Sequence, residues 1–213
     1  MPKLVKLILS VVSRIITALP NAALAAFFLI TWIKPYQFGD KVVSYLLLLM
    51  LMEFINVHAA GFLGSVIISK YGKVKKLFSI VGLGLFYTIF VGGFSLAFHV
   101  WWPLVAFWGL ILNRLLSVFL GRTLDEDRKA RLSVSWFGGA LCYLVAVFLT
   151  LIPFIPALGI TDAVISHQAL PGSGIWIDEP YRVVAAGCIY FTGVTLISLF
   201  DFKIASWFKR GRT

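Results

Sequence analysis

The sequence has little charge for its length and few residues of the kinds that ligate metals. Only 13% of its 213 residues are charged, nine are acidic, and 60% are hydrophobic. Soluble domains contain about 25% charged and 45–50% apolar residues. The composition therefore excludes an ordinary soluble protein and indicates an integral membrane protein. Because no polar insert is long enough to fold separately, we expect one transmembrane domain over residues 1–213.

Cysteine and histidine are also scarce, with two of the former and three of the latter. Cys142 and Cys188 lie within apolar runs, which favours small buried hydrophobic residues over a disulfide or a thiolate metal site. The sequence has no HExxH motif and no pair of histidines four residues apart, as a helical zinc site would need. His99 and His167 are expected near or outside one membrane surface, so neither can join His58 in binding a haem. We expect no metal site and no cofactor.

The abundant apolar residues are grouped into six runs. A helix needs about 20 apolar residues to cross the hydrocarbon core of a bilayer, and backbone groups in lipid must be hydrogen-bonded within the segment. The sequence therefore predicts an all-α polytopic membrane protein, a bundle of six transmembrane helices with short loops. The expected spans are 15–33, 42–68, 77–100, 104–120, 132–160 and 183–200.

The basic residues are distributed unevenly between the two sets of loops. Fifteen of the nineteen Lys and Arg residues fall on one side, namely Lys3, Lys6, Arg14, Lys70, Lys73, Lys75, Lys76, Arg122, Arg128, Lys129, Arg131, Lys203, Lys209, Arg210 and Arg212. The other side has Lys34, Lys41 and Arg182. By the positive-inside rule, both termini are expected in the cytoplasm and residues 161–182 outside, in a cell (inner) membrane. The net charge of +10 is thus attributed to topology, and nucleic acid is not expected as a partner.

Both ends of the chain are predicted to lie at the membrane surface. In residues 1–14, apolar and basic positions take opposite faces of a helix, which indicates an amphipathic cytoplasmic helix. A simple cytoplasmic extension of the first span is about equally compatible with this pattern. Residues 203–213 form a basic tail for which we expect an anchoring role only.

Two charged residues stand near the middle of apolar runs. At about 1.5 Å per residue, Glu53 lies roughly 16 Å and Arg114 roughly 15 Å from the outer ends of their spans. Charges at this depth commonly face the protein interior and pair, so we expect a Glu53–Arg114 ion pair. Asn113 and Asn56 could satisfy the remaining hydrogen bonds, while His58 faces a different neighbour on its helix. A proton or cation carrier at Glu53 is the functional alternative to a structural pair.

These patterns favour a non-catalytic accessory or scaffold subunit of a larger membrane complex. The loops are short, and no set of acid, base, nucleophile and metal ligands is visible, so an enzyme is less well supported. In the long loop, Trp176 and Tyr181 accompany Pro and Gly turn formers and are expected to contact a partner. Other membrane subunits, the lipid bilayer and a second copy of the chain are the expected partners. The alternative is a small proton- or cation-coupled transporter with Glu53 as its carrier.

Overall fold

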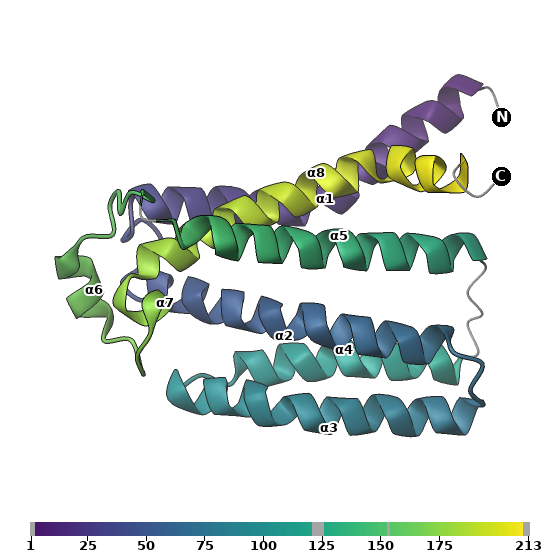
Figure 1. The fold of residues 1–213 in the computed structure, drawn as a ribbon, viewed down its shortest axis with the longest axis horizontal. Helices are drawn as coiled ribbons and strands as arrows, with labels where there is room; N and C mark the ends of the chain where they lie inside the picture. The colour runs from purple at the N-terminus through teal and green to yellow at the C-terminus, as the bar shows by residue number, and fades with distance from the viewer. Residues whose placement is uncertain (1–2, 121–125, 153, 211–213) are drawn as a thin grey trace. The chain divides into compact units, whose positions relative to one another are not determined.

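The fold is built entirely from helices. The computed structural model describes residues 3–120, 126–152 and 154–210, and no strand occurs within these ranges. The helices are α1 (Lys3–Ile33), α2 (Val42–Ile68), α3 (Lys73–Ala97), α4 (Trp102–Phe119), α5 (Glu126–Thr150), α6 (Asp162–Gln168), α7 (Ile175–Asp178) and α8 (Pro180–Arg210) (Figure 1). Six of them, α1 to α5 and α8, are long and apolar enough to cross a membrane. The predicted all-α fold with six spanning helices is confirmed.

The helices divide into two compact units. The terminal unit comprises residues 1–47, 137–169 and 173–213, and the central unit comprises residues 48–136 and 170–172. All of α1, the second half of α5 and all of α8 belong to the terminal unit. The central unit contains most of α2, all of α3 and α4, and the first half of α5. Each unit therefore includes several spanning helices.

A three-helix core holds the central unit together. Its buried residues come from one face each of α2, α3 and α4: Leu48, Met52, Ile55, Ala59, Leu63, Ile80, Tyr87, Val91, Phe107 and Ile111. On α2 these residues recur every three or four positions, the spacing that places side chains on one helical face. Between helices in a bilayer, close van der Waals packing provides the attraction, because lipid is as apolar as the side chains.

Within this unit, a glycine on α2 makes room for a side chain of α5. A Cβ atom at Gly61 would lie 2.7 Å from the Trp136 ring, so only glycine leaves room for the indole. The indole Nε1 donates a hydrogen bond of 2.8 Å to the Val57 carbonyl, one turn earlier on α2. The absence of a side chain at Gly61 thus lets the Trp136 ring pack closely against α2. At Gly64, by contrast, a Cβ atom would meet no atom within 4 Å.

The terminal unit is organised around the antiparallel pair α1 and α8, whose free ends lie on the same side of the unit (Figure 1). Phe28 of α1 is fully buried, and a Cβ atom at Gly187 of α8 would lie only 2.1 Å from its ring. The Phe28 ring also packs on Phe191, with ring centroids 5.4 Å apart. A glycine on one helix thus receives an aromatic side chain from the other.

Some helix ends differ from the predicted limits. α5 ends at Thr150 and not at 160, because Pro153 and Pro156 follow in the sequence and proline cannot continue a helical hydrogen-bond ladder. α1 is continuous from Lys3 to Ile33, so residues 3–14 prolong the first span. The side chains of the basic tail, 203–213, lie outside the described part of the structure. The predicted long loop contains α6 and α7, and α8 already begins at Pro180.

Candidate functional site

The predicted midmembrane cluster begins on α2. Glu53 and Asn56 are half-buried and lie three residues apart, so they share one flank of the helix beside the core residues Met52 and Ile55. His58 is exposed, and its Nδ1 donates a hydrogen bond of 2.9 Å to the Phe54 carbonyl. Its ring also packs on Phe54, with centroids 4.3 Å apart. His58 is therefore held by its own helix.

The two predicted site residues on α4 differ in their surroundings. Arg114 is half-buried, whereas Asn113 is exposed. Phe107 and Ile111 carry the core face of α4, and at about 100° per residue Asn113 falls on nearly the opposite side. The structure thus shields Glu53, Asn56 and Arg114 in part and leaves His58 and Asn113 on the surface. The Glu53–Arg114 pair stays a prediction.

A second polar group, which the sequence analysis missed, closes the end of α5. Arg182 stands in the first turn of α8 and is only 8% exposed. Its Nη1 donates hydrogen bonds to the carbonyl oxygens of Thr150, at 2.7 Å, and of Ile152, at 3.0 Å. The last carbonyls of a helix have no partner within the helix and carry the negative end of its dipole. The guanidinium therefore supplies both the missing donors and the compensating charge.

Two neighbours hold the Arg182 side chain in place. Glu179 accepts a hydrogen bond from Arg182 Nε and forms an ion pair with it. The Tyr181 hydroxyl donates to the same carboxylate oxygen at 2.6 Å. The hydrogen bonds from Tyr181 and Arg182 hold the pKa of Glu179 below its ordinary value, so the carboxylate stays charged at neutral pH. Tyr181 is thus engaged within its own chain, and its expected role as a partner contact stays a prediction.

Helix α6 closes the start of α2 in a comparable way. The buried Gln168 accepts a hydrogen bond of 3.2 Å from the Ser44 backbone N–H through Oε1. Its Nε2 donates to the Asp40 carbonyl at 2.5 Å. Ser44 belongs to the first turn of α2, where backbone N–H groups have no intrahelical acceptor. One carboxamide therefore fastens α6 to both the loop before α2 and the helix itself.

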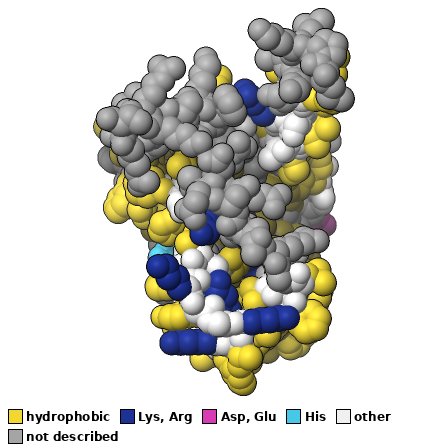
Figure 2. All heavy atoms as spheres, turned by 90° about the vertical axis from the view of Figure 1, so that its right-hand side faces the viewer, with side chains coloured by type: hydrophobic (Ala, Val, Ile, Leu, Met, Phe, Trp, Pro, Cys, Tyr) yellow, Lys and Arg dark blue, Asp and Glu magenta, His cyan; other side chains and the backbone are white. Residues whose placement is uncertain are grey.

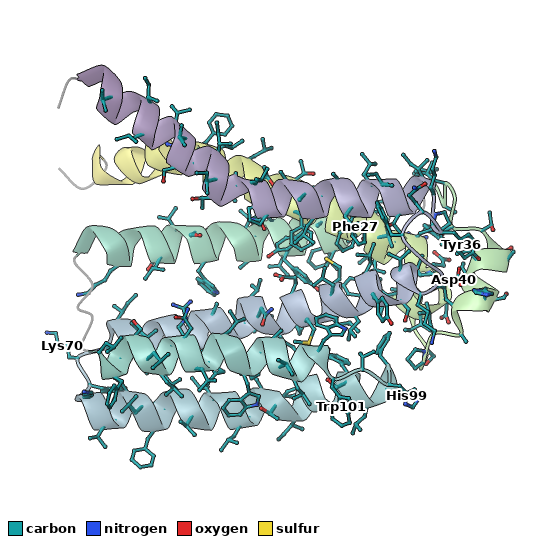
Figure 3. The ribbon with its side chains drawn as sticks, turned by 180° about the vertical axis from the view of Figure 1, so that it is seen from behind. Phe27, Tyr36, Asp40, Lys70, His99 and Trp101 are labelled. Carbon is teal, nitrogen blue, oxygen red and sulfur yellow. The ribbon has the colours of Figure 1, made fainter. Side chains whose placement is uncertain are left out.

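Further contacts fix the same region to the end of α1. The Trp32 indole donates to the Pro156 carbonyl at 3.0 Å, and the Gly159 N–H donates to the Trp32 carbonyl, also at 3.0 Å. The ring of Tyr36 meets that of His167 edge to face at 6.0 Å. Tyr36 and Asp40 lie close together at this end of the terminal unit (Figure 3). We call residues 154–169 and 173–179 the cap. It is a folded element with many fixed points.

One sequence signal could have revealed the role of Arg182. A positive charge in the first turn of a helix opposes the helix dipole, so an arginine there requires compensation from another group. The topology prediction counts Arg182 only as a basic residue at the end of the long loop, and no partner for its charge was predicted. Gln168 gives no comparable signal, because a glutamine in a loop is ordinary.

A metal site in the described part of the chain would need a cluster of His, Cys, Asp or Glu side chains. No group of three His, Cys, Asp or Glu side chains in that part is arranged to hold a metal ion. Comparison of the chain with models of protein families, with curated proteins and with solved structures finds no match.

The Arg182 contacts predict a specific loss of stability. Arg182→Met keeps the length of the side chain but removes the donors to Thr150 and Ile152 and the charge opposite Glu179. We expect the thermal midpoint in detergent to fall by several degrees and the cap to be cleaved faster by protease. Lys34→Met, at an exposed basic residue of the same unit, is the matched control and should change neither. Equal behaviour of the two variants would contradict the assigned role.

The expected pairing of Glu53 with Arg114 is tested by a double-mutant cycle. Each single change, Glu53→Gln or Arg114→Gln, should lower the unfolding midpoint, because it leaves the other charge without its partner at midmembrane depth. The double variant should recover much of the loss. A pair in contact should give a coupling free energy of about 0.5–3 kcal/mol. Additive losses would exclude the pair and would favour Glu53 as a functional carboxylate.

Proposed function

We propose that the protein is a non-catalytic accessory or scaffold subunit of a larger membrane complex. The observation that carries this proposal is how the polar side chains of the cap region are used. Four side chains form hydrogen bonds with one another or with backbone groups near helix ends: Gln168, Glu179, Tyr181 and Arg182. Such an arrangement gives a fixed shape and leaves none of these groups to act on a substrate.

A fixed cap is suited to presenting a surface to a partner. Binding costs less free energy when the contact surface is ordered beforehand. Tyr36, Phe38 and Ile175 lie on or beside the cap with exposed fractions of 46%, 48% and 45%, and Trp176 is half-buried. Large aromatic side chains often dominate the energy of protein interfaces. These residues form the surface through which we propose that another subunit docks.

A transporter is the second candidate, and it rests on one observation in α2. Glu53 and Asn56 are half-buried on one flank of a spanning helix, and ionisable residues inside membranes often mark ion pathways. In this alternative, Glu53 carries a proton or cation and Asn56 lines its path. The scaffold proposal is preferred because the hydrogen bonds of Arg182 join the end of α5 to the start of α8 and leave its guanidinium a structural role.

In the proposed orientation, both termini and the α2–α3 connection face the cytoplasm. The proposed membrane is an inner membrane of the bacterial type. Lys70, Lys73, Lys75 and Lys76 lie at this connection, and Lys and Arg side chains gather at that end of the central unit (Figure 2). Within the central unit, Lys70 and Trp101 lie at opposite ends (Figure 3). A basic end and an aromatic end agree with the positive-inside rule and with an interfacial aromatic belt.

Labelling in intact cells tests this orientation. A cysteine introduced at Ser173 should react with an impermeant maleimide added from outside, whereas one introduced at Ser69 should react only after the cells are opened. Both variants are made after replacing Cys142 and Cys188 by alanine, because these are free thiols. Labelling of Ser69→Cys but not Ser173→Cys in intact cells would reverse the proposed topology.

Purification in a mild detergent tests the scaffold role. The tagged protein should bring down other membrane subunits in fixed ratio, and Trp176→Ala should reduce their recovery several-fold without changing the amount of the chain itself. Trp101→Ala, at an aromatic residue that is 65% exposed in the α3–α4 turn, is the control and should leave recovery unchanged. Unaccompanied protein that moves protons or cations into liposomes, and fails to do so as Glu53→Gln, would decide for the transporter.

A further inference from the structure

One face of α4 carries an ordered row of exposed residues that the core does not use. The row consists of Trp102, Ala106, Gly109, Asn113, Leu116 and Leu120, where Leu120 directly follows the last helical residue. All six are exposed in the single chain. We call this row the α4 seam. It lies on the side of α4 away from the core residues Phe107 and Ile111.

The spacing of the α4 seam is that of a helix that pairs with another helix. Its members are separated alternately by four and three residues, which is the heptad pattern of coiled coils. Ala106 and Gly109 are small and follow each other in the row, so a second backbone can approach closely there. A Cβ atom at Gly109 would meet nothing within 4 Å, which means that no described part of the central unit fills this space.

The α4 seam contains one polar side chain, Asn113, which needs a hydrogen-bond partner. The residue lies about 4 Å from the midpoint of the helix, as estimated from a rise of 1.5 Å per residue. A carboxamide needs both hydrogen-bond donors and acceptors, and burying it in hydrocarbon without them is unfavourable. Within the described part of the chain, no residue provides Asn113 with a hydrogen bond. A second molecule that presents a polar side chain at the same depth can supply that hydrogen bond.

We propose that the α4 seam binds the α4 seam of a second copy of this chain in a parallel, two-fold symmetric pair. All copies of one membrane protein insert with the same orientation, so two α4 helices that meet are parallel. The two-fold axis then places Asn113 opposite Asn113, and each carboxamide offers the donor and the acceptor that the other needs. A polar residue at a central seam position is also the feature that fixes register and oligomeric state in coiled coils.

This inference deepens the proposed scaffold function, because it makes a second copy the first partner in the complex. Lipid alone provides no hydrogen bond at this depth. A different protein would need its own polar side chain opposite Asn113, whereas a second copy necessarily has one. The seam therefore favours its own copy as occupant.

Disulfide crosslinking in membranes tests the pairing face. In the full-length chain with Cys142 and Cys188 replaced by alanine, Ala106→Cys and Leu116→Cys should form crosslinked dimers on mild oxidation. Leu110→Cys and Leu112→Cys are the matched controls, because both residues are exposed on the same helix, at 51% and 54%. They lie about a quarter turn to either side of the seam. Crosslinking that is equal at all four positions, or confined to Leu110 or Leu112, would overturn the proposal.

Energy transfer between labelled copies in lipid vesicles tests the part played by Asn113. Asn113→Leu should weaken self-association about tenfold, the size expected for the loss of interhelical hydrogen bonds in a membrane. Asn113→Gln should retain most of it, and Leu112→Ala should change nothing. Unchanged association of Asn113→Leu would contradict an asparagine-centred register.

The results separate failure of the pair from failure of the scaffold role. If other subunits co-purify but the seam cysteines do not crosslink, the scaffold role stands and the two-fold pair is wrong. If Asn113→Leu then also loses those subunits, the seam binds a different protein, which equally overturns the pair. Seam crosslinks in protein that purifies without other subunits would support the pair and contradict the scaffold role.

Discussion

The arrangement of the described chain depends on closing the ends of its helices. A helix leaves four backbone N–H groups and four carbonyl groups without internal partners, and near a bilayer water is a poor substitute. Here the partners come from other segments. Gln168 closes the start of α2, Lys76 donates to the Ile67 carbonyl at 2.7 Å at its end, and Arg182 closes the end of α5. Each bond also fixes a connection between two helices.

This constraint explains why the cap is folded although it contains little regular structure. Its two helices, α6 and α7, have seven and four residues, which is too short for independent stability. Their position is set by Gln168 on one side and by the Glu179–Arg182 pair on the other. Because its polar side chains are bonded in this way, the cap has a defined surface, and the proposed scaffold role rests on this property. The exposed asparagine on α4 suggests that the same rule, every polar group satisfied, extends to a second copy.

The sequence was sufficient wherever a feature depends on local hydropathy. The limits predicted for the second span, 42–68, are those of α2, because a long, mostly apolar run determines both its ends. The sequence was insufficient where two hydrogen-bonded residues are far apart in the chain. Gln168 lies 128 residues from Asp40, and Arg182 lies 32 residues from Thr150, and no periodicity connects such pairs. The midmembrane residues were located by depth, but sequence spacing alone could not show that Asn113 faces away from the core while Asn56 lies beside it.

Amide hydrogen exchange at Ser44 tests the closing of helix ends most directly. Its N–H lies in the first turn of α2 and donates a hydrogen bond to the side chain of Gln168. The account predicts slow exchange at Ser44 in the unaltered protein in lipid nanodiscs and fast exchange in Gln168→Leu, with exchange in the middle of α2 unchanged. Fast exchange at Ser44 in both proteins would contradict it.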